Sequence, residues 1–229
     1  MKKSVLKLLL IAFVILFSFS CTLPFSNIFN KPTDTPSGGD ESNIVFSDSF
    51  KNNKNQWAEG ENDGDYADAF YMFQDGVYHW RIYSYQLANV TSWPDFTIDG
   101  DFTMSVQAKQ LTDSPDDADY GLILRSPDNY AFLSFTVSNQ DYSVYVFDEN
   151  SEWVEIVPWD SSDVVRPGEY NELTVQRVGY DYTFSVNGEE LATFTYSDFT
   201  EGQPGLNVDI FPEGTTIEFE FDDFLVTAP

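Results

Sequence analysis

Hydrophobic and polar residues alternate along most of the chain after residue 43, which is the pattern of half-buried β-strands. The clearest example is the segment 101–109, whose hydrophobic positions are Phe102, Met104, Val106 and Ala108. The same period of two recurs in four further segments: Tyr78–Ile82, Tyr142–Val146, Tyr182–Val186 and Ile217–Phe221. No stretch beyond the N-terminal segment sustains a helical period of 3.6 residues. We therefore predict an all-β fold of two antiparallel sheets whose outer faces are solvated.

Turn residues refine this prediction at two places. Asn187-Gly188 separates the strand Tyr182–Val186 from a second apolar segment, 190–196, and predicts a two-residue hairpin with a type I′ turn. Near the C-terminus the hydrophobic phase jumps from Phe221 to Phe224, so Asp222-Asp223 has the extra residue expected of a β-bulge.

The N-terminus has the pattern of an export signal. Met1, Lys2, Lys3 and Lys7 are followed by the apolar stretch Leu8–Phe19, which is too short to span a bilayer comfortably. The end of this stretch, Ser18-Phe19-Ser20-Cys21, resembles the lipobox of bacterial lipoproteins. That resemblance implies a lipoprotein signal peptide over residues 1–20 and lipidation of Cys21. The alternatives are an ordinary secretory signal or an uncleaved anchor with an incidental cysteine.

Residues 21–43 are rich in Pro, Gly, Ser, Thr and Asn, which favours a flexible tether. Residues 44–229 then form one domain without a second linker. We expect an exported protein, lipid-anchored to the outer face of a bacterial cell membrane or outer membrane.

Composition excludes several functions. The 229 residues contain 38 Asp and Glu against 11 Lys and Arg, a formal net charge of -27, so nucleic acid is not an expected partner. A single Cys excludes a disulfide framework, and a single His excludes a His-based zinc cluster.

Several motifs resemble a known fold family. They include Phe46-Ser-Asp-Ser-Phe50, Gly121-Leu-Ile-Leu-Arg125, Val186-Asn-Gly188 and Phe221-Asp-Asp-Phe-Leu-Val226. Together they look like the concanavalin A-like (laminin G-like) jelly roll of bacterial surface lipoproteins and of the 3-keto-disaccharide hydrolase domain. The resemblance implies an all-β, two-sheet antiparallel jelly-roll sandwich. It also implies neighbouring terminal strands, with Asp48 near Asp222 or Asp223 and a structural calcium ion in that region.

Acidic residues suggest two kinds of site, each with a simpler interpretation. Glu218, Glu220 and Asp222 share one strand face, as the carboxyl groups of a glycoside hydrolase could, but solvated surface acids explain them better. We therefore lean against an enzyme. Calcium could bind the acidic loop 61–68 or the second acidic loop, although soluble surface loops explain both better. The second loop contains Asp113, Asp116, Asp117 and Asp119.

Aromatic and basic residues suggest a carbohydrate site. If Tyr78, Trp80 and Ile82 point into the core, then His79, Arg81, Tyr83 and Tyr85 form an exposed row on the other face. Arg125 could lie on the same sheet face, in a neighbouring strand. The alternative is that the arginines form structural ion pairs and the tyrosines pack across strands. Four tryptophans near strand ends could fill the core or line a binding surface: Trp57, Trp93, Trp153 and Trp159.

These observations predict a membrane-anchored, cell-surface binding module without catalytic activity, with carbohydrate as its partner through the aromatic and arginine face. One alternative is an enzyme of the 3-keto-disaccharide or glucan hydrolase class. The other is a structural envelope module or a protein-interaction module.

Overall fold

The computed structural model describes residues 43–112 and 116–229. The predicted signal peptide, Cys21 and all of the tether up to residue 42 lie outside these ranges. The described residues contain sixteen β-strands and no α-helix. Within them there is accordingly no helix long and apolar enough to cross a membrane.

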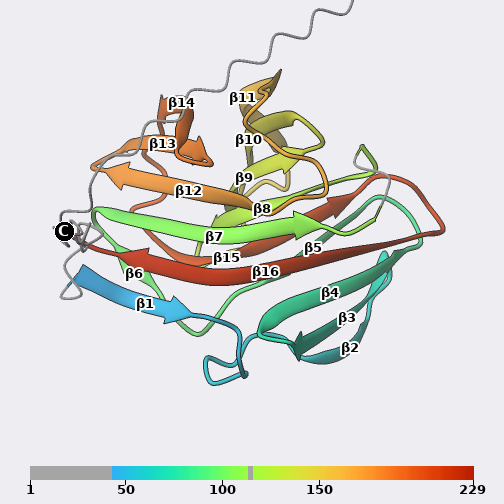
Figure 1. The fold of residues 1–229 in the computed structure, drawn as a ribbon. Helices are drawn as coiled ribbons and strands as arrows, with labels where there is room; N and C mark the ends of the chain where they lie inside the picture. The colour runs from blue at the N-terminus through green and yellow to red at the C-terminus, as the bar shows by residue number, and fades with distance from the viewer. Residues whose placement is uncertain (1–42, 113–115) are drawn as a thin grey trace, which may run out of the picture. The chain divides into compact units, whose positions relative to one another are not determined.

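The strands form two antiparallel sheets (Figure 1). The nine-stranded sheet has the order β14-β13-β12-β7-β16-β4-β3-β2, and β1 pairs with β16. The seven-stranded sheet has the order β11-β10-β9-β8-β15-β5, and β6 pairs with β15. The bounds of the first sheet are β1 Ile44–Asp48, β2 Gly60–Asp63, β3 Ala67–Gln74, β4 Val77–Ser84, β7 Phe102–Gln110, β12 Asn171–Val178, β13 Asp181–Val186, β14 Glu189–Thr195 and β16 Thr215–Thr227. Those of the second are β5 Ala88–Ser92, β6 Ile98–Asp99, β8 Ala118–Arg125, β9 Phe132–Ser138, β10 Asp141–Phe147, β11 Trp153–Ser161 and β15 Glu201–Ile210.

The core lies between the two sheets. Alternate residues of β7 and β4 are buried, as the period of two predicts. Aromatic rings from opposite sheets meet across this core: Tyr120 of β8 lies 5.6 Å from Phe219 of β16, and Phe135 of β9 lies 6.0 Å from Tyr182 of β13. The predicted two-sheet antiparallel sandwich is therefore confirmed.

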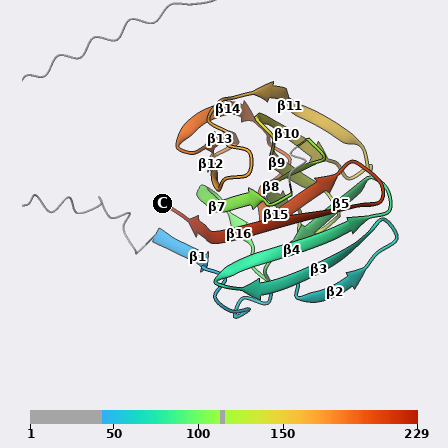
Figure 2. The ribbon, with the colours of Figure 1, turned by 45° about the vertical axis from the view of Figure 1, so that its right-hand side comes forward.

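Local predictions at the turns are also confirmed. Asn187 and Gly188 both have positive φ, 53° and 80°, and connect β13 to β14 as a two-residue hairpin. The register of β16 against β7 shifts between Asp222 and Leu225, and Asp223 has a φ of 48°, which is the expected bulge. The first and last strands are neighbours, because β1 runs antiparallel to β16 with Asp48 opposite Phe224 (Figure 2).

The prediction of solvated outer faces is wrong for the centre of the seven-stranded sheet. Every residue of β9 is buried, and so is every residue of β8 except Arg125. The outward side chains here include the polar residues Ser134, Thr136 and Asn207 and the apolar Ile123. Larger side chains on the flanking strands stand around them, so the centre of this face is recessed.

Candidate binding cleft

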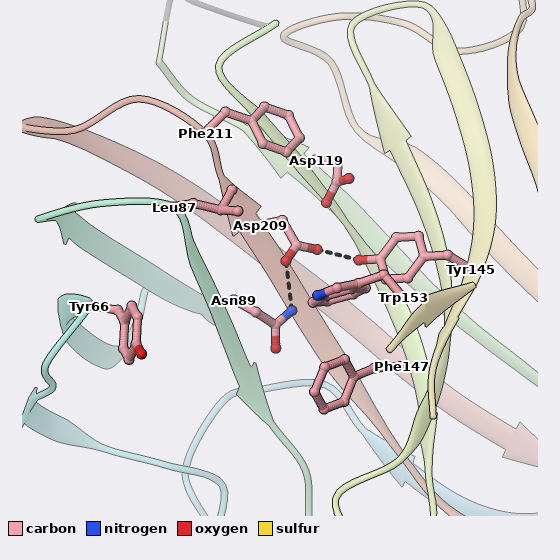
Figure 3. A pocket seen from close by; sticks show the side chains of 9 residues that line it. All are labelled: Tyr66, Leu87, Asn89, Asp119, Tyr145, Phe147, Trp153, Asp209 and Phe211. Carbon is pink, nitrogen blue, oxygen red and sulfur yellow. Dashed lines mark hydrogen bonds between the residues drawn. The ribbon is translucent and has the colours of Figure 1, made fainter. Parts of the chain in front are cut away.

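The recess holds a cleft with a volume of about 590 Å³ on the outer face of the seven-stranded sheet. This volume falls in the range of small-molecule sites, which is about 300–1,000 Å³. Strands β5, β8, β10, β11 and β15 contribute to it together with the turns that follow β4 and β15 and the turn that joins β2 to β3. Figure 3 shows the lining residues: Tyr66, Leu87, Asn89, Asp119, Tyr145, Phe147, Trp153, Asp209 and Phe211.

Two aspartates form the floor of the cleft. Asp119 of β8 and Asp209 of β15 are direct partners in the antiparallel register, so both side chains emerge on the same face. They are 2% and 7% exposed. Asp209 accepts hydrogen bonds from Asn89 Nδ2 at 2.8 Å and from the hydroxyl of Tyr145 (Figure 3). These bonds hold its carboxyl group in place beneath the cleft.

Burial raises the pKa of Asp119 well above its usual range. The negative charge of Asp209 raises it further. Burial likewise raises the pKa of Tyr145, and the charges of the two aspartates add to the shift. The pair therefore holds a proton at a pH where exposed aspartates are ionised, and Tyr145 stays a hydrogen-bond donor.

One wall of the cleft is aromatic. Trp153 of β11 lies 4.9 Å from Phe147 and 5.1 Å from Tyr145, both on β10, measured between ring centroids. Phe132 of β9 supports this wall from below, 5.7 Å from Trp153. Trp153 is nevertheless 53% exposed, although a tryptophan side chain gains free energy from burial. An exposed ring held in place by other rings is a platform on which a ligand can stack.

Several polar atoms on the outer face of the seven-stranded sheet lack hydrogen-bond partners within the described part of the chain. They include Asp119 Oδ1, which lines the cleft, and Thr136 Oγ1 and Asn207 Oδ1, whose residues do not line it. Thr136 and Asn207 flank Gly121 of β8 in register, so they belong to the same recessed face as the aspartates. Buried polar atoms without partners are rare in folded proteins and often mark a place for water or a ligand. The cleft thus combines polar groups below with aromatic faces at the side.

The predicted row on β4 lies on the other sheet. His79, Arg81, Tyr83 and Tyr85 all point outward from the nine-stranded sheet, as the alternation predicts. Arg81 and Tyr83 line a shallow groove there, but its other walls include three acids, Glu61, Asp63 and Asp68. Each member of the row already has a partner. Arg81 lies over the ring of Phe70 at 5.6 Å, His79 Nε2 is 3.5 Å from Glu218 Oε2, Tyr85 donates a hydrogen bond to Asp68, and the rings of Tyr83 and Tyr85 are 5.3 Å apart.

Arg125 does not join this row, so that prediction is wrong. It lies at the end of β8 in the seven-stranded sheet, whereas β4 belongs to the nine-stranded sheet. Sequence alternation places a residue on a face of its strand but does not assign the strand to a sheet. The Arg125 guanidinium stacks over Trp93 at 4.5 Å and donates to Gln203 Oε1 at 2.6 Å. It shares a face with Asp119 but lies six residues away, about 20 Å along the strand.

The acids of β16 face away from the cleft. Glu218 and Glu220 lie opposite Arg81 and His79 in the register with β4. Tyr170 donates a hydrogen bond to Glu220 Oε2 at 2.7 Å. Glu218 and Glu220 therefore lie on the outer face of the nine-stranded sheet, where their immediate partners are surface residues.

The region predicted for calcium brings together only part of the expected set. Asp48 and Asp223 line one groove, and Lys54 lines it as well. The carboxylate of Asp48 is buried and accepts three hydrogen bonds: from the Phe50 backbone N–H at 2.8 Å, from Asn55 Nδ2 at 2.7 Å and from Trp57 Nε1 at 3.0 Å. Asp48 therefore orders the segment after β1. Calcium binding here stays a prediction.

The two acidic loops differ from their predicted form. Residues 61–68 belong largely to the hairpin of β2 and β3. Asp119 lies inside β8, 2% exposed, and is not part of a solvated loop. Asp113 lies outside the described residues. Across residues 43–112 and 116–229, no three His, Cys, Asp or Glu side chains are grouped so as to hold a metal ion.

Sequence reasoning missed most of the cleft. A signal was available in Tyr142–Phe147: if Tyr142, Val144 and Val146 face the core, then Tyr145 and Phe147 must point outward, which is unusual for large aromatic residues. Of the four tryptophans left open, Trp57 is buried and Trp153 lines the cleft. Pairing Asp119 with Asp209 required the register between strands distant in sequence.

Comparisons with known proteins support the fold. No family model and no curated protein matches the sequence. Among solved structures, a carbohydrate-binding module (CBM66) from Bacillus subtilis is 14% identical to this chain, with a TM-score of 0.52. The match covers 65% of this chain and 86% of the module. The catalytic domain of an endo-1,3-β-glucanase (laminarinase) from Thermotoga petrophila is 11% identical, with a TM-score of 0.56, over 81% of this chain and 97% of its own.

A glycoside hydrolase of family 16 from Bacteroides ovatus, solved with a glucan product, is 10% identical, with a TM-score of 0.57, over 80% of this chain and 100% of its own. At these identities the comparisons show the fold alone. It is the concanavalin A-like jelly roll.

Proposed function

We propose that this chain is a carbohydrate-binding module that takes a glycan into the cleft without cleaving it. The observation that carries this proposal is the half-exposed Trp153, held by Phe147 and Tyr145 above a buried polar floor. Sugars present apolar C–H faces and polar hydroxyl edges, so they complement an aromatic wall beside hydrogen-bonding groups. We further propose that an exported chain is anchored through lipid on Cys21, with the globular domain free to reach glycans outside the membrane.

The structural neighbours agree with this ligand class. Of the three proteins above, one is a carbohydrate-binding module and the other two act on glucans. Because the likeness is one of fold, it supports the proposal without identifying a ligand.

The arrangement of the two floor carboxyl groups supports a non-catalytic role. Glycoside hydrolases hold their two carboxyl groups about 5–5.5 Å or about 6.5–9.5 Å apart, so that sugar or water fits between them. Here Asp119 and Asp209 are direct partners on neighbouring strands and lie side by side in the floor, so they do not face each other across the cleft. This arrangement supports binding without cleavage. Release of reducing sugar from any bound polysaccharide would revive the hydrolase alternative.

The test is affinity electrophoresis of the soluble domain, residues 43–229, in gels containing soluble β-glucan, mannan, xylan or chitosan. Trp153→Ala should weaken binding at least about tenfold, because a central tryptophan platform typically dominates such interfaces. Trp159→Ala is the matched control, because Trp159 is 43% exposed on the same strand but does not line the cleft. It should bind like the parent.

The same gels test the row on β4. Arg81→Ala and Tyr83→Ala should leave binding unchanged if the cleft is the site, and should weaken it if the nine-stranded sheet binds the glycan. If no polysaccharide of the panel retards the parent protein or any variant, carbohydrate binding is contradicted. The envelope or protein-interaction alternative is then favoured.

A further inference from the structure

The floor of the cleft carries negative charge that no cationic side chain within residues 43–112 and 116–229 balances from the cleft lining. None of the described lining residues is Lys, Arg or His. The groups that hydrogen-bond to Asp209 are all neutral: the Tyr145 hydroxyl, Asn89 Nδ2 at 2.8 Å and Asn207 Nδ2 at 3.3 Å. Buried carboxylates are normally paired with a cation or a metal, so this pair is incomplete.

Asp119 makes the imbalance sharper. Its side chain is only 2% exposed, and its Oδ1 atom has no hydrogen-bond partner among the described residues. In the free cleft the cost of burying two negative charges is relieved by a retained proton, in agreement with the raised pKa of Asp119. A ligand that brought its own positive charge could replace that proton.

The walls above the aspartates also suit a cation. Aromatic faces carry negative potential and attract ammonium groups. The cleft has such rings on both sides, with Trp153 and Phe147 on the β10–β11 side and Tyr66 and Phe211 from the turns opposite (Figure 3). Tyr66 and Phe211 are 59% and 43% exposed. Carboxyl groups below and aromatic rings around them form a site for an organic cation.

We propose that the cleft selects glycans with a free amino group, whose ammonium is bound by Asp209 and Asp119 between the aromatic faces. This inference rests on the proposed carbohydrate function and specifies its ligand class. On binding, the ammonium enters with its charge, Asp119 ionises, and the proton held by the aspartate pair is released to solvent. Amino-sugar units such as those of deacetylated chitin have this chemistry.

Titration calorimetry can compare three β-1,4-linked tetrasaccharides, built from glucosamine, N-acetylglucosamine or glucose. The measurement is made at about pH 6, roughly two units below the pKa of an α-amino group. Because a charge-assisted hydrogen bond exceeds a neutral one, the glucosamine tetramer should bind at least about tenfold more tightly than the other two. Equal affinities for the three tetramers would overturn amino selectivity but leave carbohydrate binding intact. Absence of binding by all three would count against both.

Two further comparisons test whether the ligand must be a sugar and whether the two aspartates cause the selectivity. Spermidine supplies ammonium groups without a sugar and should bind more weakly than the glucosamine tetramer; equal binding would overturn selection for a glycan. Asp119→Asn/Asp209→Asn should abolish the preference for the amino tetramer. Glu189→Gln/Glu190→Gln replaces two acids by their amides at exposed positions of β14 and should preserve it.

If the exposed control lost the preference equally, the net charge of -27 would be its cause, and the proposed site would be wrong. Calorimetry in two buffers with different ionisation enthalpies should also reveal proton release by the parent protein on binding the glucosamine tetramer. The Asp119→Asn/Asp209→Asn variant should show no such release. Proton release of equal size from both proteins would contradict the role of the pair. A cooperative melting transition of the variant distinguishes loss of selectivity from loss of fold.

Discussion

Asp119 and Asp209 lie directly opposite each other on neighbouring strands β8 and β15, buried beneath the same cleft. Two carboxyl groups in this position cannot both carry a charge without a large cost, so one of them keeps a proton. This relationship contributes to the way the stability of the protein depends on pH.

We expect Asp119→Asn to flatten the pH dependence of stability. In the unfolded chain an aspartate ionises near pH 4, whereas in the folded protein the raised pKa of Asp119 keeps its proton bound to higher pH. Above about pH 4 the folded state therefore binds more protons than the unfolded state, and the free energy of unfolding falls as pH rises towards the folded pKa. Chemical denaturation at several pH values measures this slope.

The control for this prediction is Glu190→Gln, which removes one charge from an exposed position of β14. It should keep the slope of the parent protein, because it changes only general charge repulsion. Parallel curves for the parent and Asp119→Asn would show that Asp119 does not carry the effect.

Asp48→Ala should destabilise the fold by about 2–4 kcal/mol. The substitution leaves two buried donors, Phe50 N–H and Trp57 Nε1, without an acceptor, and each buried unsatisfied group costs about 1–3 kcal/mol. Asn55 Nδ2 also loses its bond to Asp48 but keeps its bond to the Ser47 carbonyl. Asn55→Ala removes only one of the donors and should cost about 1 kcal/mol. Urea denaturation of both variants measures the difference, and a cost for Asp48→Ala no larger than that for Asn55→Ala would contradict this account.

Calcium at the β1–β16 end should raise the melting temperature if the resemblance that suggested it extends to ion binding. The comparison is a thermal melt of the domain with excess calcium against one with chelator, because a ligand bound only by the folded state stabilises it. Asp223→Asn should reduce any shift. An identical midpoint in calcium and in chelator would eliminate this site, in agreement with an Asp48 carboxylate already occupied by protein donors.

Cys21→Ser should release the protein from the membrane fraction of cells that express the full chain. Acyl chains on Cys21 would provide the anchor, and the acidic domain would be repelled by anionic headgroups. Fractionation with detection of radiolabelled fatty acid measures both properties. A parent protein that incorporates no label would favour the ordinary secretory signal or the uncleaved anchor.

The sequence predicted the parts of the fold that depend on near neighbours. Alternation placed Phe102 and Met104 inward on β7, and Asn187-Gly188 specified its hairpin, because side-chain direction and turn geometry are properties of a few consecutive residues. The extra residue at Asp222-Asp223 likewise identified the bulge.

The candidate site was harder to predict from the sequence than the fold, for a physical reason. Alternation correctly directed Arg81 and Tyr83 outward, but it could not show that Arg125 lies in the other sheet. It also treated Asp119 as a surface acid, because nothing within β8 reveals that Asp209, ninety residues later, pairs with it.

By itself the sequence determined an all-β sandwich, its acidic character and the direction of most strand side chains, since these follow from local periodicity and composition. Only the tertiary structure decided where the cleft lies, which aromatic residues form its wall, and that Asp119 and Asp209 share its floor. These features arise from the order and register of strands far apart in the chain, and long-range pairing is set by how the whole core packs.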